Sequence, residues 1–421
     1  MPNRGSRSHS SGGRVSRRRV LATTGGTVAA VTAGCVGNGG DDGPDSVKFG
    51  AMFPQSGVFG YTGDQVKPAI QYTFDKHNDS DEILPDTELE FVTADTKGDP
   101  EQAVTVAQEL RGQEDVDHFL GPIFSSTANS VRNWIRNKDA VMTIFGSGPA
   151  FITNDENCTR KLFQPAPNLI NATRAAAEHG VNNFGENVYV VFMDYAFGRA
   201  VLSALEATVP DLGGSVVDTA GKPPGSEDYT GVINDIKDSD ADWLFMGMAG
   251  SGAVPFFSQA AQAELDLPMH FNVTPDQTGQ LTPDQFDKLG QLHSVVLYSS
   301  KWDRGPNQSF VTEYRDRTGQ APPVAASNGF KAPSILFRMI QNAGGPGASV
   351  DDIIAAGRDL TYSSITGELS IRRCNHAGLH DISEIEVTGV SDGAPEIELG
   401  KRYDITNYVE PCDEIDCTHS S

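Results

Sequence analysis

The sequence has no apolar run long enough to cross a bilayer as a helix, and it is poor in basic residues. Its 421 residues include 32 Lys and Arg against 56 Asp and Glu, which gives a formal net charge of −24. A surface this acidic repels nucleic-acid phosphates and anionic lipid head groups. We therefore expect neither nucleic acid nor a lipid surface as a partner of the folded part of the chain.

The motifs of common enzyme classes are also missing. A hydrolase nucleophile elbow follows the pattern GxSxG, which neither FSSTA (124–128) nor FGSGP (145–149) matches. HExxH, the P-loop and the paired-glycine dinucleotide motif are absent too. The most metal-like spot pairs Cys374 with His376, and two ligands on one strand are too few for a site. The sequence thus predicts no catalytic residue, no cofactor and no metal, and a protein that is not an enzyme.

The basic residues are concentrated at the N-terminus. The first 34 residues contain no acidic residue and six arginines: Arg4, Arg7, Arg14, Arg17, Arg18 and Arg19. The rest of the chain has 26 basic and 56 acidic residues, a net charge of −30. Acidity spread over a whole chain suits concentrated salt, where screening relieves the self-repulsion. This pattern indicates a halophilic, archaeal source, with an ordinary acidic mesophile protein as the alternative.

The N-terminal segment has the order of parts of an export signal. SRRRVL (16–21) resembles a twin-arginine motif, and the weakly apolar core at 22–34 is too short to span a bilayer. Cys35 stands where a lipoprotein signal places its lipidated cysteine, although Thr32 replaces the usual Leu. We expect a signal over residues 1–35, a flexible tether over 36–46, and a protein lipid-anchored outside the cytoplasmic membrane. A basic tail with a stray cysteine is the alternative.

Cysteine is scarce, and the four residues beyond the signal form no CxxC: Cys158, Cys374, Cys412 and Cys417. In an oxidising exterior they allow two disulfides, in three possible connectivities. The sequence does not choose between these, although Cys412 and Cys417 are close enough to bridge locally. Five sequons could carry surface glycans, at Asn78, Asn157, Asn171, Asn272 and Asn307.

From about Ser46 onward, short apolar runs alternate with amphipathic stretches. The runs at 47–53, 89–95, 116–123 and 141–148 are typical of buried strands, and 64–78 and 100–112 of helices. After the proline-bearing stretch 161–168 the alternation restarts and continues to residue 299. This predicts an α/β fold of two similar lobes, each a parallel sheet with helices on both faces.

The turns that follow these strands share small, hydroxyl-bearing or glycine-rich residues, as in FSSTANS (124–130), FGSGPA (145–150) and MGMAGSGA (246–253). In open parallel sheets, ligands bind beyond the carboxyl ends of the strands, and helix starts favour a carboxylate. Ser125, Ser126 and Thr127 are therefore candidate ligand-binding residues. Simple helix capping is the alternative for each of them.

The chain from about Val47 to Gly389 resembles the periplasmic branched-chain amino acid binding proteins of ABC importers, which have the type I substrate-binding fold. The blocks that carry the resemblance include GDPEQAV (98–104), FLGPIFSSTANSV (119–131), FGSGPAFIT (145–153) and VVFMDYAFGRAV (190–201). The resemblance implies two Rossmann-like lobes joined by three crossovers, with a ligand in the cleft between them.

Carried over by position, the resemblance implies that a ligand carboxylate is held by Ser125 and Ser147 together with the main-chain amides of Ser126 and Gly148. Positions expected to close over the rest of the ligand are Phe197, Ala249 and Asp276. Tyr61 and Phe59 are candidate pocket walls, or else ordinary packed aromatics. Phe197 stands where the family often has Tyr, and MAGSGA where an aromatic is common, so the ligand is an amino acid, an amide or an aromatic carboxylate.

The expected division places one lobe at 47–164 plus 303–364 and the other at 165–302 plus 365–421. The expected function is solute binding for an ABC importer by hinge closure, with the permease subunits as partners. A cell-surface sensory ectodomain of the same fold, and an exported hydrolase using Ser125, are the alternatives.

Overall fold

The computed structural model describes residues 46–57, 59–80, 82–146, 152–154, 158–248, 252–272 and 275–417, without the side chains of 275 and 276. The predicted signal, the tether and Cys35 therefore lie outside the described residues, as do Ser147, Gly148 and Ala249. Within the described ranges, no helix is both long and apolar enough to cross a membrane.

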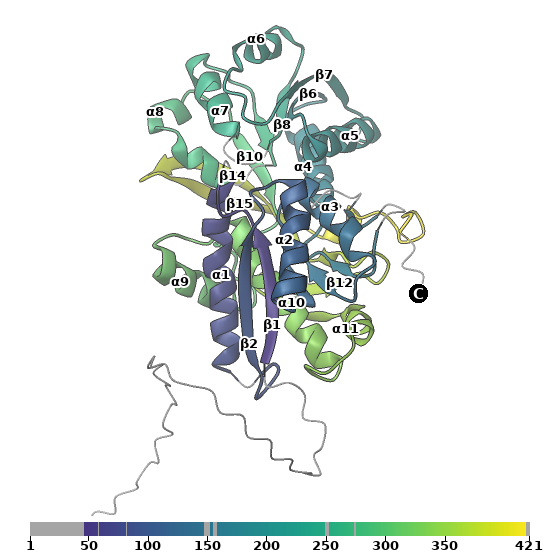
Figure 1. Cartoon of the computed structure of the whole chain (residues 1–421). Coiled ribbons are helices and arrows are strands. Elements are labelled where there is room, and N and C mark those ends of the chain that lie inside the picture. The colour runs from purple at the N-terminus through teal and green to yellow at the C-terminus, as the bar shows by residue number, and fades with distance from the viewer. Residues whose placement is uncertain are drawn as a thin grey trace, which may run out of the picture. The chain divides into compact units, whose positions relative to one another are not determined.

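The first sheet has five strands in the order β2-β1-β3-β4-β5, all parallel. Figure 1 shows β1 and β2 side by side, next to α1 and α2. Its strands are β1 (Ser46–Phe53), β2 (Glu88–Asp95), β3 (His118–Leu120), β4 (Val141–Thr143) and β5 (Leu162–Phe163). The helices that accompany it are α1 (Gly60–Asn78), α2 (Pro100–Gln113), α3 (Ser125–Ile135), α9 (Asn307–Thr318), α10 (Val324–Asn342) and α11 (Val350–Gly357).

Helices cover both faces of this sheet, as the sequence predicts. On one face, side chains of α1 and α10 such as Ile70 and Ile335 pack in a cluster with Phe49. On the other, Val106 of α2 and Val131 of α3 pack in a second cluster. Because both faces are covered, the inner strands β1, β3 and β4 are mostly buried and read as short apolar runs, whereas the edge strand β2 keeps Glu88 and Glu90 exposed.

The second sheet has seven strands in the order β15-β14-β10-β9-β8-β6-β7. The strands from β6 to β10 pair in parallel, whereas β14 is antiparallel to both β10 and β15. Its strands are β6 (Asn187–Met193), β7 (Ser215–Lys222), β8 (Trp243–Gly247), β9 (Met269–Phe271), β10 (Leu292–Val296), β14 (Ile382–Ser391) and β15 (Ala394–Tyr403).

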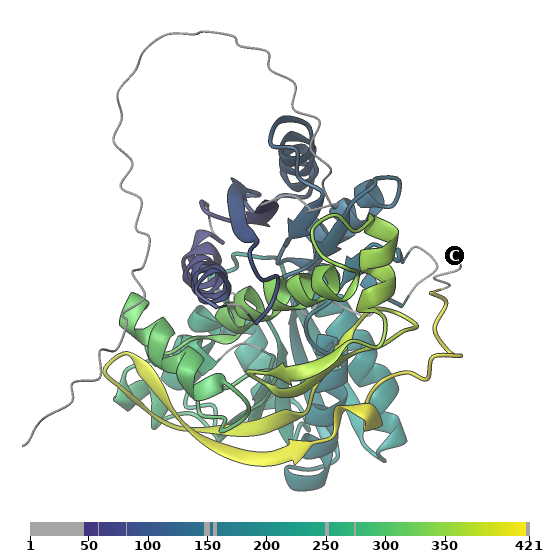
Figure 2. The ribbon, with the colours of Figure 1, turned by 90° about the horizontal axis from the view of Figure 1, so that it is seen from below.

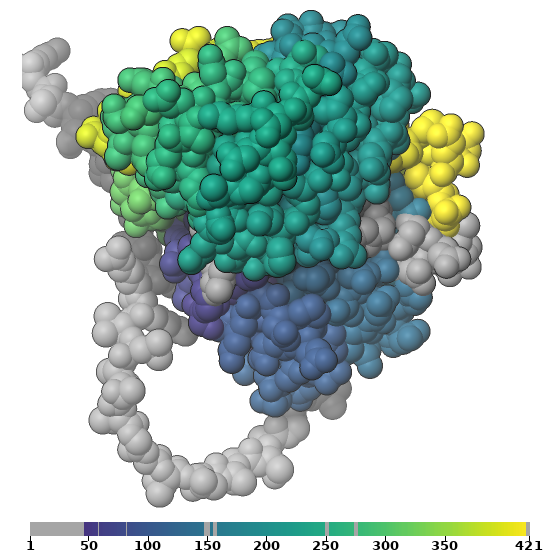
Figure 3. Space-filling model, turned by 90° about the horizontal axis from the view of Figure 1, so that it is seen from above, coloured from purple at the N-terminus to yellow at the C-terminus, as the bar shows by residue number. Residues whose placement is uncertain are grey.

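The helices of the second sheet also form two groups. The part of the chain that builds this sheet, in teal and green, fills the upper half of Figure 3. Side chains of α4 (Leu169–Asn183) and α5 (Ala196–Asp211) share one apolar cluster with strands β6 and β8. Side chains of α6 (Thr230–Asp238) and α7 (Ala253–Gln262) share the other, next to the short elements η3 (Pro275–Gln280) and α8 (Pro283–Phe286). Since β6 to β10 repeat the order of β1 to β5, two similar α/β sets are present, as predicted.

The predicted helices begin where their local sequence favours a start. The side chain of Asp99 caps α2 by accepting a hydrogen bond of 2.8 Å from Gln102 N, with Pro100 in the first turn. In α1 and α5 a glycine lets the first turn pack against the preceding strand end. A Cβ on Gly63 would lie 2.1 Å from Pro54 O, and one on Gly198 would lie 2.0 Å from Met193 O. These glycines set the short strand-to-helix turns of both sheets.

The chain after residue 360 forms features that the sequence did not predict. A small antiparallel sheet consists of β11 (Thr361–Ser364), β12 (Gly367–Ile371) and β13 (Gly378–Leu379), and β14 and β15 then form a long hairpin (Figure 2). The predicted lobe boundary at 364/365 falls between the paired strands β11 and β12. The lobe limits remain a prediction.

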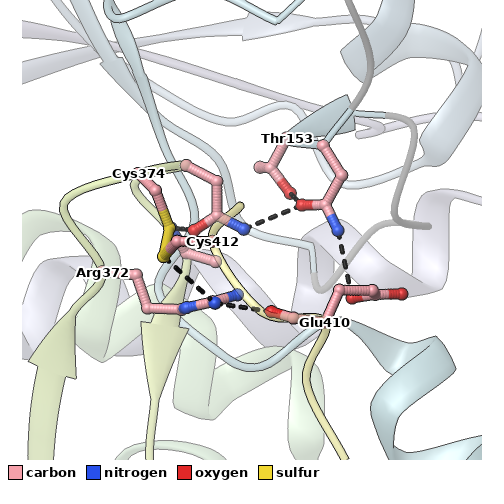
Figure 4. The surroundings of a disulfide bond; sticks show 8 residues. Thr153, Arg372, Cys374, Glu410 and Cys412 are labelled. Carbon is pink, nitrogen blue, oxygen red and sulfur yellow. Dashed lines mark hydrogen bonds between the residues drawn. A yellow bond between two sulfur atoms is a disulfide. The ribbon is translucent and has the colours of Figure 1, made fainter. Parts of the chain in front are cut away.

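The segment after β15, which includes η4 (Ile405–Asn407), is joined to the rest of the chain by two disulfides, Cys158–Cys417 and Cys374–Cys412. Figure 4 shows the second, with Arg372 donating to Glu410 O at 2.7 Å and to Cys412 Sγ at 3.3 Å. The Glu410 carboxylate also binds Arg174 of α4, at 2.7 Å. The local Cys412–Cys417 bridge that spacing allowed is therefore not the one formed.

Two of the predicted glycosylation sites are wrong. Asn307 is fully buried, and its Nδ2 donates to Ser299 O and Trp302 O. Asn171 is also buried, and its Nδ2 donates to Tyr408 O at 2.7 Å. A glycan needs this nitrogen at the surface, so neither asparagine can carry one in the folded protein.

Candidate functional site

Strand order locates a candidate binding site at the carboxyl ends of the first sheet. The order β2-β1-β3-β4-β5 reverses direction between β1 and β3, so the connections after these two strands run to opposite sides. Such a switch point leaves a crevice beyond the strand ends, where open α/β sheets bind their ligands. The loops concerned are 54–59 after β1 and 121–124 after β3.

The loop after β1 is fixed by the last residue of β2. The Asp95 carboxylate accepts hydrogen bonds from Gln55 N (2.8 Å), Ser56 Oγ (2.5 Å) and Lys97 N (2.8 Å). Burial alone would raise the pKa of Asp95, but these hydrogen bonds outweigh it and hold the pKa below its ordinary value. The carboxylate therefore stays ionised and orders two strand-end loops at once.

Aromatic contacts bring the third loop to the same place. The ring of Phe59, in the loop after β1, lies 4.4 Å from the ring of Phe124, in the loop after β3. Phe59 also packs on Gly98 after β2, where an added Cβ would lie 2.6 Å from Phe59 Cδ2. Gly98 has a positive φ of 73°, so no other residue would fit there without strain. The turns after β1, β2 and β3 thus converge, as expected from the sequence.

The first turn of α3 presents the predicted residues Ser125, Ser126 and Thr127 at this convergence. The N-cap position is Phe124, and no side chain caps the helix, so helix capping does not account for these hydroxyls. The hydroxyl of the fully buried Thr127 donates to Phe124 O at 2.7 Å, which shapes the turn. Ser125 is mostly buried and Ser126 half-buried. The first backbone N–H groups of a helix have no partner within it, so this turn suits an anion.

The second sheet has its own switch point, between β6 and β8. An ion pair joins the loop after β6 to the first turn of α5, where Arg199 Nε donates to Asp194 Oδ1 at 2.6 Å. Phe197, predicted to line the ligand, is 5% exposed and belongs to the apolar cluster beneath α5. Its ring contacts that of Tyr195, with centroids 5.8 Å apart.

Tyr195 is the last residue of this loop, directly before α5. Burial raises the pKa of the Tyr195 hydroxyl, and the neighbouring Tyr61 hydroxyl raises it further. Tyr61 lies in the first turn of α1 and is 36% exposed. Helices α3 and α5, which start at the two switch points, also contact each other. Tyr195 therefore lies near enough to the predicted wall residue Tyr61 for the two hydroxyls to interact electrostatically.

The remaining predicted residues lie wholly or partly outside the described residues, so their place in the site stays a prediction. Asp276 lies in η3, and its side chain is outside the described part of the chain, like Ser147, Gly148 and Ala249. The sequence reasoning missed Asp95, Phe124 and Tyr195. A signal for Asp95 existed in the acidic residue directly before the turn TKGDP, since strand-end carboxylates often accept loop amides. Tyr195 was passed over because the resemblance pointed two residues further, to Phe197.

Comparison with known proteins agrees with the fold. A family model described as "Periplasmic binding protein" matches residues 46–394. Leu/Ile/Val-binding protein homolog 6 of Brucella abortus (strain 2308) is 26% identical over 361 residues, covering 83% of this chain and 89% of that protein.

Solved structures share the fold at lower identity. A solute-binding protein of an ABC transporter from Rhodopseudomonas palustris BisB5, in complex with 3,4-dihydroxybenzoic acid, aligns with a TM-score of 0.78 and 21% identity, covering 86% of this chain and 98% of that one. An amino acid ABC transporter substrate-binding protein from Pseudomonas fluorescens Pf-5 gives a TM-score of 0.78 and 19% identity, covering 89% of this chain and 100% of that one.

Proposed function

The chain belongs to the periplasmic binding protein family, and on that premise we propose that it is the extracytoplasmic solute-binding protein of an ABC importer. Its ligand is a small carboxylate or amide: a branched-chain amino acid, a related amide or an aromatic carboxylate. The chain binds and releases this ligand unchanged and is not an enzyme. The ligand-bound form is recognised by the permease subunits.

The observation that carries the proposal is the convergence of three strand-end loops on the first turn of α3. Asp95 and the Phe59–Phe124 contact hold this turn in place, so binding does not have to order it. In this proposal a carboxylate or amide oxygen of the ligand is bound by Ser125 and by the backbone amides of Ser126 and Thr127. Ser147 and Gly148 complete the cradle in the same proposal.

The second sheet supplies the other side of the site. Tyr61 and Tyr195 form one wall, and Phe197 supports Tyr195 from beneath. Ala249 and Asp276 contribute the small side chain and the acidic group that meet the rest of the ligand. Hinge closure follows because the ligand contacts both sides and so binds the closed form more tightly than the open one.

Export and anchoring are part of the same proposal. The twin-arginine segment directs export, and Cys35 carries the lipid that holds the protein at the outer face of the cytoplasmic membrane. The surplus of 56 acidic over 32 basic residues supports a halophilic, archaeal source. Mass spectrometry of native material tests the lipid, since an unmodified N-terminal peptide spanning Cys35 would contradict it.

A thermal-shift screen in concentrated salt tests the function. Amino acids, amides and benzoates are added singly to the mature chain, and at least one is expected to raise the melting temperature. Ser125→Ala should remove that shift, whereas Thr105→Ala, on the exposed side of α2, should keep it. A complete screen without a stabilising compound would contradict solute binding. If the protein binds a ligand but does not stimulate its transport in vesicles that contain the permease encoded next to it, the sensory alternative would be favoured.

A further inference from the structure

A cluster of ionisable side chains lies against the second sheet, outside the solute site. It consists of His179 on α4, His270 on β9, His293 on β10 and Glu384 on β14. His270 and His293 are register partners on adjacent parallel strands, so their side chains point to the same face. Helix α4 covers that face and contacts β10, which brings His179 over the two rings.

Three of these side chains, His179, His293 and Glu384, are close enough to share one ion, and His270 contacts His179. His179 Nδ1 lies 2.9 Å from His270 Nε2, and His293 Nδ1 lies 2.8 Å from Glu384 Oε1. One ligand atom each of His179, His293 and Glu384 lies within 4.8 Å of the other two. The three ring centroids are 5.0, 5.3 and 5.9 Å apart. Two imidazole rings bound to one tetrahedral zinc ion, with Zn–N bonds near 2.0–2.1 Å, have their ring centroids about 5 Å apart.

Burial sets this cluster apart from a surface group of histidines. His270 is fully buried, His293 is 7% exposed and Glu384 is 5% exposed. His293 Nε2 and His270 Nδ1 have no hydrogen-bond partner within the described residues. A buried polar atom without a partner costs about 1–3 kcal/mol and calls for an explanation such as an ion.

The surroundings fit a metal site as well. The ring of Phe184 lies 5.2 Å from that of His179 and 5.0 Å from that of His293, and Trp243 lies 6.3 Å from His270. This apolar wall excludes water and strengthens the bond between a cation and its ligands.

We propose that His179, His293 and Glu384 bind a divalent transition-metal ion of the zinc class, and that His270 positions His179 through their hydrogen bond. Two imidazoles and one carboxylate are an established zinc ligand set. The ion joins helix α4 to strands β10 and β14, three elements that are far apart in sequence. Its role is to stabilise the second sheet, and it takes no part in solute binding.

Metal titration of the mature chain tests this proposal. Protein treated with EDTA and dialysed in concentrated salt, which screens unspecific binding to the acidic surface, is titrated with Zn²⁺ and, separately, Co²⁺. One equivalent of Zn²⁺ should bind and raise the melting temperature. Co²⁺ should give the intense visible absorption of a tetrahedral site.

Variants separate the site from adventitious binding. His179→Ala, at the half-exposed position, and Glu384→Gln should each lose most of the affinity, and His270→Gln should weaken it about 10–100-fold as a positioning residue. His77→Gln, on α1, removes a histidine from the first sheet's helices and should bind Zn²⁺ like the parent. Absence of a one-equivalent transition in the parent, or equal affinity in folded His179→Ala, would overturn the proposal in favour of a metal-free hydrogen-bonded cluster.

Discussion

The Ser56 hydroxyl donates a hydrogen bond of 2.5 Å to Oδ2 of Asp95, which ties the loop after β1 to the end of β2. Asp95 also accepts from the backbone N–H groups of Gln55 and Lys97. The first turn of α3 is held through Phe59, which sits at the end of the same loop. The order of the candidate site therefore depends on a carboxylate that need not contact the ligand.

Asp95→Ala should weaken solute binding about tenfold and lower the free energy of unfolding by about 1–3 kcal/mol, because two loop amides and a hydroxyl lose their acceptor. Calorimetric titration with the solute found in the screen measures the first effect, and urea unfolding the second. Asp99→Ala is the matched control. It removes the cap of α2, costs about 1 kcal/mol and should leave the affinity unchanged.

Lys331 predicts a pH dependence of stability. It lies in α10, is fully buried, and its Nζ has no hydrogen-bond partner among the residues described. Burial lowers the pKa of Lys331 from 10.5 to about 7, and the nearby His380 is also buried. Between pH 7 and pH 10.5, Lys331 binds a proton in the unfolded chain but not in the folded chain. Stability should therefore rise with pH across this window, by about 1.4 kcal/mol per unit from this group.

Lys331→Met should raise the free energy of unfolding at pH 7 and flatten its rise between pH 7 and pH 10. Urea unfolding at several pH values measures both effects. Lys48→Met is the control, since Lys48 is exposed and its ion pair with Glu114 contributes little. A Lys331→Met protein with the parent's pH slope would show that Lys331 is not the group responsible.

The disulfides predict a specific peptide map. Digestion without reduction should yield Cys158 linked to Cys417 and Cys374 linked to Cys412, and a Cys412–Cys417 peptide would contradict the structure. Replacing Cys374 and Cys412 together by Ser should lower the free energy of unfolding by about 2–4 kcal/mol, because the unfolded chain gains freedom. Thermal unfolding of the parent and the double variant measures this loss.

Buried sequons give a further test. Asn171 and Asn307 use their amide nitrogens in internal hydrogen bonds, so the native protein should carry no glycan at either position. Glycopeptide mass spectrometry of material from the native host reads each site separately. A glycan on Asn307 would mean that the segment after β10 folds differently from the structure described.

The sequence predicted the parts of the fold that local physics determines. Strands such as β1 and β6 are covered on both faces and therefore stand out as apolar runs, and α2 carries its own capping residue Asp99. The hairpin β14–β15 was missed because one of its strands, β15, is mostly exposed and lacks such a run. Disulfide pairing depends on contacts between distant segments, which the spacing of cysteines does not encode.

The sequence predicted one part of the candidate site and missed others. The hydroxyl-rich start of α3 was identified because Ser125, Ser126 and Thr127 follow a strand directly. Phe197 was assigned to the ligand from its place in the motif; its ring lies in the apolar cluster beneath α5, and a contact with the ligand stays a prediction. The buried histidines escaped notice because their positions are up to 114 residues apart, from His179 to His293.

Calorimetric titration of the mature protein and its Ser125→Ala variant with the solute identified by the screen tests the central claim most directly. One solute should bind per chain, and Ser125→Ala should weaken binding at least tenfold, about 1.4 kcal/mol, because a hydrogen bond to a charged oxygen is lost. Thr105→Ala should bind like the parent. Equal affinity in parent and Ser125→Ala proteins would contradict the role of α3, and with it the proposed site.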